Sequence, residues 1–190
     1  MPYKYTKDRA WFYGSEIYKT ILTCIDSNKE NNILEIGCYE GLSSVYFADN
    51  LLRHANSSMI CVDPFLTIEN NDHKELLKSN EEKNFDFNIS SCNNSEKISV
   101  RKITSDEFFK TNDKYFNFIY IDGCHEPDFI TRDMNNSFKY LLKDGIMWMD
   151  DYWGGDGIKI RNAMNYWLNE NKEKFVLIHK GYQIAIKKII

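Results

Sequence analysis

The sequence predicts an α/β fold in which helices cover both faces of a mostly parallel, seven-stranded sheet. Five apolar segments of strand length alternate with segments whose apolar residues recur at helical spacing. Polar or acidic residues follow each of the five, at the place where open α/β sheets bind ligands. Two more short strands close the chain, and Lys180-Gly181 between them predicts one antiparallel hairpin with a two-residue connection.

The first predicted strand, over residues 33–36, runs into a turn bracketed by two glycines. Glu35 places one carboxylate among the apolar residues of the strand, and Gly37 and Gly41 flank the turn. A helix is expected to follow over residues 43–52. Glycine lets the backbone approach a ligand closely at a helix N-terminus, so this segment predicts the site of a nucleotide-like cofactor.

The glycine spacing argues against a dinucleotide with a pyrophosphate. Tyr39 stands where the dinucleotide fingerprint has its middle glycine. An ordinary strand–turn–helix without a ligand stays open as an alternative, because isolated glycine motifs are weak signals.

The second and third predicted strands also end in polar groups. Residues 59–65 form a buried strand that closes around Asp63 and Pro64. An acid at this place in doubly wound folds contacts ribose hydroxyls, so Asp63 is the expected ribose ligand. Residues 98–103 alternate apolar and polar side chains, which predicts the third strand, and the polar segment 104–106 follows it.

Three aspartates follow the fourth and fifth predicted strands. The fourth strand, over residues 115–121, is followed by Asp122, and the fifth, over residues 146–149, by Asp150 and Asp151. Adjacent strands would bring these acids together, and three carboxylates repel one another unless protons or a cation compensate. Mg²⁺ prefers oxygen ligands, so a divalent cation is expected here.

One histidine lies close to these acids in the sequence. His125 ends the segment Asp122-Gly123-Cys124-His125, and its ordinary pKa would let it take a proton from a substrate hydroxyl. A purely structural role for His125 is equally open.

Four further segments carry helical periodicity. The second of them is polar and is expected to combine a helix with a loosely ordered connection. The third is expected to end at a C-cap formed by residues 143–145. The four helical segments are residues 8–27, 69–94, 127–142 and 159–169, and the two hairpin strands are residues 175–179 and 182–187.

Length and composition predict one compact domain. The chain has 190 residues, 43% of them hydrophobic, which is enough for a sizeable core. Its net charge of −4 argues against a nucleic-acid partner, which would require a basic surface. The five cysteines are odd in number and lack CxxC spacing, which favours reduced thiols and a cytoplasmic location. The apolar runs are too short to span a membrane, so no membrane partner is expected.

The motifs together resemble those of class I S-adenosylmethionine-dependent methyltransferases. The pattern Glu35-x-Gly37-x-x-x-Gly41-x-Ser43 is similar to the EIGxxxGxS motif of a small branch of these enzymes, and residues 122–125 match its DGxH motif. The resemblance covers roughly residues 30–155. It implies a Rossmann-like class I methyltransferase fold, in which the closing hairpin distinguishes the chain from dinucleotide dehydrogenases.

The resemblance also divides the chain and assigns its site residues. It implies an N-terminal helical cap over residues 1–28, a cofactor-binding core over residues 30–155, and a final helix and hairpin over residues 156–190. In that reading the polar residues after the third strand face the adenine. The implied S-adenosylmethionine ligands are Glu35, Gly37, Cys38, Tyr39, Gly41, Ser43, Asp63, Pro64, Ser105, Asp106, Asp122 and His125.

The acids at the ends of strands four and five look like the metal site of the catechol and the macrolide-sugar or aminocoumarin-sugar O-methyltransferases. By that likeness Asp122, Asp150 and Asp151 would bind Mg²⁺. The chain departs from the branch at Pro127, where these sequences more often carry an aromatic residue, so a different loop shape is expected here.

The expected function is therefore transfer of a methyl group from S-adenosylmethionine to a hydroxyl of a small molecule or glycan, with Asp122 and His125 as the catalytic groups. Sugar hydroxyls are the first expectation for the acceptor and catechol-like phenols the second. Aromatic residues at positions 11–13 and 152–153 are expected partly in the core and partly as a substrate wall. An NAD-dependent oxidoreductase and a non-catalytic methyltransferase-like binding protein remain alternatives, and a homodimer is possible.

Overall fold

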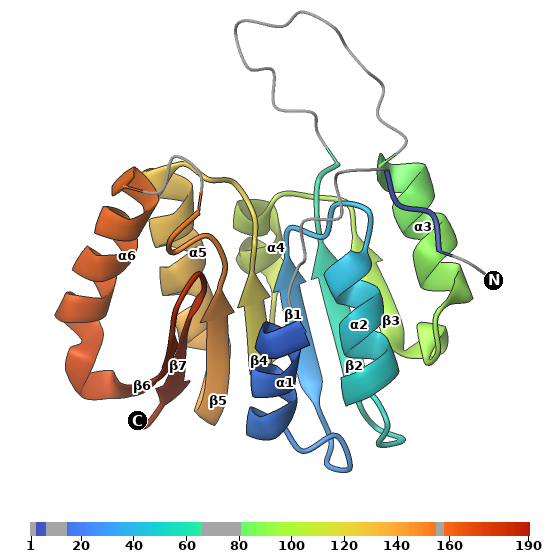
Figure 1. The fold of residues 1–190 in the computed structure, drawn as a ribbon, viewed down its shortest axis with the longest axis horizontal. Helices are drawn as coiled ribbons and strands as arrows, with labels where there is room; N and C mark the ends of the chain where they lie inside the picture. The colour runs from blue at the N-terminus through green and yellow to red at the C-terminus, as the bar shows by residue number, and fades with distance from the viewer. Residues whose placement is uncertain (1–2, 7–14, 66–80, 155–157) are drawn as a thin grey trace, which may run out of the picture.

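The computed structural model describes residues 3–6, 15–65, 81–154 and 158–190. Within them lies one seven-stranded sheet with the strand order β3-β2-β1-β4-β5-β7-β6 (Figure 1). Strands β1 to β5 pair in parallel, whereas β7 runs antiparallel to both β5 and β6. The strands are β1 (Asn32–Ile36), β2 (Ser58–Val62), β3 (Ile98–Arg101), β4 (Phe116–Ile121), β5 (Leu141–Met149), β6 (Phe175–Lys180) and β7 (Ile184–Lys188).

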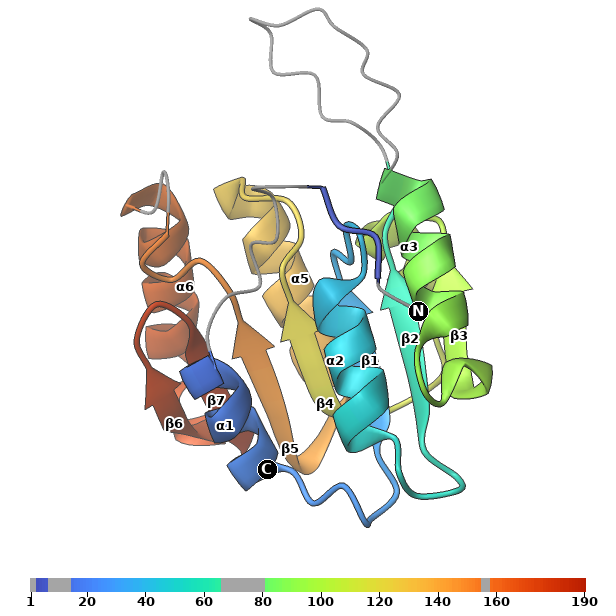
Figure 2. The same ribbon diagram turned by 45° about the vertical axis from the view of Figure 1, so that its right-hand side comes forward.

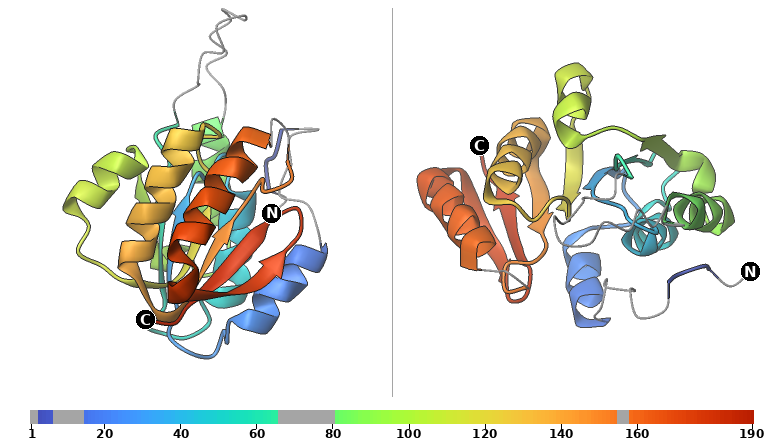
Figure 3. Two further views of the ribbon diagram at one scale, coloured as in Figure 1. Left: turned by 90° about the vertical axis from the view of Figure 1, so that its left-hand side faces the viewer. Right: turned by 90° about the horizontal axis from the view of Figure 1, so that it is seen from above.

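Among the described residues, six α-helices cover the sheet, three on each face, and the view from above in Figure 3 shows the two layers. The first three, α1 (Ser15–Cys24), α2 (Leu42–Leu51) and α3 (Glu81–Ser91), lie on one face. The other three, α4 (Ser105–Thr111), α5 (Pro127–Tyr140) and α6 (Ile158–Asn171), lie on the opposite face. Two 3₁₀ turns, η1 (Ser95–Lys97) and η2 (Lys172–Lys174), precede β3 and β6.

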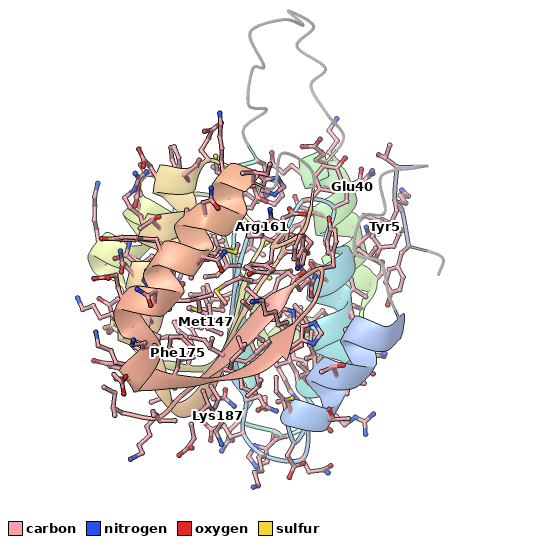
Figure 4. All side chains as sticks on the ribbon, turned by 60° about the vertical axis from the view of Figure 1, so that its left-hand side comes forward. Tyr5, Glu40, Met147, Arg161, Phe175 and Lys187 are labelled. Carbon is pink, nitrogen blue, oxygen red and sulfur yellow. The ribbon has the colours of Figure 1, made fainter. Side chains whose placement is uncertain are left out.

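The alternation of side chains along the strands produces two separate cores. In β1, for example, Ile33 packs toward α1 to α3 and Leu34 toward α4 to α6. In Figure 4, Met147 and Phe175 lie between α6 and the sheet, where both belong to the second of these cores. Because both faces are covered, the central strands are mostly apolar, and Glu35 of β1 is a buried exception.

The strand order reverses between β1 and β4, so the carboxyl ends of these two strands flank the switch point of the sheet. Backbone hydrogen bonds continue past the strand ends: the N–H of Gly37 donates to Val62 and that of Asp122 donates to Ile36. The N–H of Asp150 donates to Ile121 in the same way. The sheet therefore fixes the backbone of the residues that follow each strand. These are the residues that the sequence marked as polar.

The structure differs from the sequence prediction at the end of α5. The helix ends at Tyr140 and β5 begins at Leu141, so the predicted C-cap over residues 143–145 is wrong. Leu141 is buried and pairs with Phe116 of β4, with a register shift before the next pair. The left-handed residue of this segment is Asp144, with φ of 64°. Tertiary pairing to β4 thus overrides the helical pattern of the sequence.

The hairpin connection also differs. Lys180 still belongs to β6, and the connection is Gly181–Gln183 in place of the two residues predicted. The N–H of Gly181 donates to the carbonyl of Gln183, and a register shift in β6 after Leu177 absorbs the extra residue.

The remaining elements agree in kind with the predictions, with two exceptions. Helix α4 was not foreseen; Thr104 caps it in a reciprocal arrangement with Glu107. The helices predicted over residues 8–27 and 69–94 are observed over residues 15–24 and 81–91. Most of the remaining residues of these two ranges lie outside the described residues. No helix in the described part of the chain is long and apolar enough to span a membrane.

Candidate active site

The turn after β1 uses its glycines for close approach. Gly37 has φ of 82°, and a Cβ on it would lie 1.9 Å from the carbonyl oxygen of Asp122. Gly41 has φ of 81°, and a Cβ there would lie 3.0 Å from the ring of Phe85. Only glycine accommodates both conditions at Gly37, so the end of β1 and the end of β4 are drawn together at this point.

Asp63 holds the turn from the neighbouring strand β2. Its Oδ2 accepts hydrogen bonds from the backbone N–H groups of Cys38 at 2.8 Å and Tyr39 at 3.0 Å. Its Oδ1 accepts from the N–H of Phe65 at 2.7 Å, across Pro64. The expected acid is therefore at the turn, where it orders the backbone; its contact with a ribose stays a prediction.

Glu35 of β1 supports the turn through buried hydrogen bonds to α2. Its carboxylate is fully buried and accepts hydrogen bonds from the hydroxyls of Ser43 and Ser44 and from the thiol of Cys61. Burial raises the pKa of Glu35 to about 7, although these hydrogen bonds act against the rise. In this structure Glu35 and Ser43 tie β1 to α2, and direct contact with a cofactor stays a prediction for both.

Glu40, within the turn, holds the N-terminal segment. The backbone N–H and the hydroxyl of Thr6 donate to its two carboxylate oxygens at 2.6 and 2.5 Å, and the amide of Asn84 in α3 donates at 2.8 Å. Figure 4 shows Tyr5 and Glu40 on the same side of the molecule, beside α3. The sequence analysis missed this contact because no local pattern marks it.

The residues expected on the adenine side begin α4. Ser105 and Asp106 form its first turn, and Asp106 pairs with the Nε of Arg132 at 3.1 Å. Burial raises the pKa of the nearby Asp133 to about 6, while a hydrogen bond from Ser105 lowers it. These contacts do not join Ser105 or Asp106 to the glycine turn, and the role of both residues toward an adenine stays a prediction.

The acids after β4 and β5 meet as expected, together with the histidine. Ligand atoms of Asp122, His125 and Asp151 all lie within 4.8 Å of one another. The Nε2 of His125 lies 2.8 Å from Oδ2 of Asp151 and 3.8 Å from Oδ1 of Asp122. A small pocket is lined by these residues together with Cys124 and Asp150.

All three aspartates line one pocket, as predicted, but Asp150 is held differently from the other two. Its Oδ2 accepts a hydrogen bond from the hydroxyl of Tyr120 at 2.7 Å, and its Oδ1 accepts from the N–H of Asp151 at 2.7 Å. Its carboxylate is thus engaged with the fold, and His125 takes the third place in the cluster. Two adjacent residues after a strand end point different ways, which the sequence does not reveal.

The charges of the cluster compensate one another. Hydrogen bonds to Asp122 and Asp151 raise the pKa of His125 to about 10, despite its partial burial. Desolvation raises the pKa of Asp122 to about 8. Burial acts to raise the pKa of Asp151, but hydrogen bonds from His125 and Tyr182 outweigh it and lower that pKa. His125 therefore carries its proton at neutral pH here, and it could act as a base only after this pairing is broken.

Three further residues surround Asp151: Trp153, expected in part as a substrate wall, and Tyr182 and Gly154, which the sequence did not mark. The hydroxyl of Tyr182 donates to Oδ1 of Asp151 at 2.7 Å, and the N–H of Trp153 donates to the carbonyl of Tyr182. A Cβ on Gly154 would lie 2.3 Å from Oδ1 of Asp151 and 2.6 Å from the hydroxyl of Tyr182, so a larger residue there would displace these two side chains. Trp153 and Tyr182 are 58% and 52% exposed, although the guanidinium of Arg161 lies 4.1 Å from the centre of the Trp153 ring and occupies one of its faces. The aromatic residues expected at positions 11–13 lie outside the described residues.

Comparison with known proteins gave a family and several structural neighbours. A family model described as a methyltransferase domain matches residues 34–152. The O-methyltransferase TomG from Streptomyces achromogenes, involved in tomaymycin synthesis and solved with SAM, has a TM-score of 0.69 at 12% identity, covering 93% of this chain and 81% of that chain. An O-methyltransferase from Bacillus cereus, solved with SAH, has a TM-score of 0.67 at 15% identity, covering 94% and 84%.

An rRNA methylase from Streptococcus thermophilus has a TM-score of 0.66 at 8% identity, covering 92% of this chain and 95% of that chain. At these identities the likeness shows the fold. No relative was found among curated proteins.

Proposed function

The chain belongs to the methyltransferase-domain family, and on that premise we propose that it transfers the methyl group of S-adenosylmethionine to a hydroxyl oxygen of a small molecule or glycan. Its mostly parallel sheet with a closing antiparallel hairpin is the class I methyltransferase fold. The observation that carries the proposal is the contact of Gly37 with Asp122, which brings the glycine turn against the acid cluster. A methyl donor on the turn and an acceptor on the cluster would then be neighbours.

The turn fits the proposed cofactor. Gly37 and Gly41 let the turn pack closely against Asp122 and Phe85. Asp63 orders the backbone amides of Cys38 and Tyr39. When bound, S-adenosylmethionine supplies an electrophilic methyl group on a sulfonium. The protein contributes chiefly by holding the acceptor oxygen in line with that group, since positioning alone lowers such barriers strongly.

A divalent cation is proposed at Asp122, His125 and Asp151. Two carboxylates and one imidazole within 4.8 Å suit Mg²⁺ or Mn²⁺. The imidazole favours Mn²⁺ over Mg²⁺. Asp150 is not included, because its buried carboxylate, bonded to Tyr120, does not belong to this group of ligand atoms. When bound, the cation would lower the pKa of an acceptor hydroxyl. The carboxylates of the cluster are the groups beside it that can take the released proton.

The acceptor is proposed to be ring-shaped. Trp153 and Tyr182 expose their rings beside Asp151, and aromatic faces suit both sugars and planar phenols. A sugar with vicinal hydroxyls is the first choice and a catechol-like phenol the second. The net charge of −4 makes a nucleic-acid acceptor unfavourable.

Calorimetric titration with S-adenosylmethionine and S-adenosylhomocysteine tests the proposal. We expect micromolar binding to the wild type and at least about tenfold weaker binding to Asp63→Ala, because the turn amides lose their acceptor. Asp86→Ala, at an exposed carboxylate on α3, is the matched control and should bind as the wild type does. A folded wild type that binds neither compound, and binds a nicotinamide cofactor instead, would reject the methyltransferase proposal.

A further inference from the structure

The connection between β6 and β7 places two consecutive side chains on opposite sides of the acid site. Met149 at the end of β5 pairs with Ile184 at the start of β7, so this connection lies at the same edge as Asp150 and Asp151. Tyr182 is half exposed and reaches Asp151, whereas Gln183 is 2% exposed and reaches Tyr120. Tyr182 thus bonds to Asp151, and Gln183 bonds to the partner of Asp150.

Gln183 belongs to a buried chain of hydrogen bonds that ends at Asp150. The indole N–H of Trp148 donates to the side-chain oxygen of Gln183, and the amide of Gln183 donates to the hydroxyl of Tyr120 at 3.1 Å. That hydroxyl donates to Oδ2 of Asp150 at 2.7 Å. Trp148 and Tyr120 are fully buried. A buried network with each of these groups satisfied strongly favours one arrangement, since any other would leave a polar group without a partner.

Asp150, held by this network, in turn fixes the backbone of Asp151. Its second oxygen accepts the N–H of Asp151 at 2.7 Å, and Asp151 has φ of 55°, which is uncommon outside glycine. The surrounding contacts must hold such a conformation. The result is that the two oxygens of Asp151 face His125 and Tyr182. Both acids line the pocket, but the carboxylate of Asp150 is buried and bonded to Tyr120, whereas that of Asp151 is bonded to His125 and Tyr182.

We propose that Gln183 and Tyr120 are positioning residues that hold Asp150 in the fold, and that Asp151 is thereby the one acid after β5 that meets the cation and the acceptor. The assignment of a cation and an acceptor to this cluster rests on the proposed function. The separation of roles itself rests on the hydrogen bonds of the two acids.

Amide hydrogen exchange at Asp151, measured by NMR, tests the positioning role without any ligand. Gln183→Leu and Tyr120→Phe should each speed exchange of this amide by about tenfold or more, since the acceptor oxygen of Asp150 is no longer held. Tyr182→Phe, which removes the outward contact, should change it less than about threefold. Amides of β1 should be unchanged in all three variants. If Gln183→Leu does not fold, Tyr120→Phe decides alone, because it removes a single hydroxyl. Unchanged exchange at Asp151 would overturn the proposal.

Binding of Mn²⁺, followed by the electron paramagnetic resonance signal of the free ion, tests the separation of roles. Asp151→Asn should weaken binding by about tenfold or more, whereas Asp150→Asn should weaken it less than about threefold. Equal losses would mean that Asp150 is a ligand and would overturn the proposal. A wild type that binds S-adenosylhomocysteine but does not bind Mn²⁺ would reject the cation. The exchange experiment would then decide the positioning role alone. Absence of S-adenosylhomocysteine binding would instead reject the proposed function.

Discussion

The imidazole Nε2 of His125 lies 2.8 Å from Oδ2 of Asp151 and joins the segment after β4 to the segment after β5. Three carboxylates near one sheet edge require compensation, and the structure supplies it from two sources. His125 is protonated between Asp122 and Asp151, and Tyr120 donates to Asp150. The cluster is therefore stable as a hydrogen-bonded unit, and a ligand that enters it must exchange these bonds for its own.

Removal of His125 should weaken this unit. His125→Gln should lower the free energy of unfolding by about 1 kcal/mol at neutral pH, a modest value because the imidazole is 55% exposed. The same substitution made on Asp151→Asn should cost less, since the partner is already neutral. Urea unfolding of the four proteins of this double-mutant cycle measures the coupling. Costs that add without coupling would show that the pair contributes nothing.

Replacement of Gly37 should be costly. In Gly37→Ala the new Cβ would lie 1.9 Å from the carbonyl oxygen of Asp122 in a left-handed backbone, so we expect a loss of about 3 kcal/mol or more in unfolding free energy. Gly181→Ala is the control: its Cβ would lie 3.2 Å from the end of the His179 side chain, and the loss should stay below about 1 kcal/mol. Comparable losses at both positions would contradict the close contact of β1 with β4.

The buried carboxyl of Glu35 should make stability depend on pH. Burial raises its pKa from the ordinary 4.5 to about 7 in the folded protein, so the folded state binds the proton more tightly than the unfolded state. Stability from this group is present below pH 4.5 and is lost as the pH rises to about 7.

Glu35→Gln removes that titration and retains a polar side chain for Ser43 and Ser44. The difference in unfolding free energy between the wild type and Glu35→Gln should therefore fall, on the order of 3 kcal/mol, from acidic to mildly alkaline pH. Denaturant unfolding over this range gives the difference, in which shared contributions from Asp122, Asp133 and His125 cancel. A difference that does not vary with pH would mean that Glu35 keeps an ordinary pKa.

The exposed aromatic rings should affect the acceptor without affecting the cofactor. Trp153→Ala should raise the KM for a ring-shaped acceptor by about tenfold, as expected for loss of one stacking contact, and leave the affinity for S-adenosylhomocysteine unchanged. Tyr115→Ala is the control, because Tyr115 is equally exposed but precedes β4, at the opposite edge of the sheet. An unchanged KM in Trp153→Ala would remove the aromatic wall from the acceptor site.

Much of the fold could be predicted from local pattern. The apolar runs of β1, β4 and β5 and the period of α5 are strong signals, because buried parallel strands and amphipathic helices each require one pattern of side chains. The boundary between α5 and β5 and the length of the hairpin connection could not be predicted. Leu141 pairs with Phe116 of β4, and the register of β6 shifts after Leu177; both depend on partners distant in the sequence.

The sequence by itself determined that Asp63, Asp122 and Asp151 follow strands of one sheet, because each comes directly after an apolar run and parallel strands end at a common edge. Only the tertiary structure decided what each carboxylate does. Asp63 orders the turn amides, and Asp150 turns inward because Tyr120 and Gln183 donate hydrogen bonds along the path to it. Hydrogen-bond partners come from strands far apart in the chain, so the direction of a side chain follows from packing and not from its neighbours in sequence.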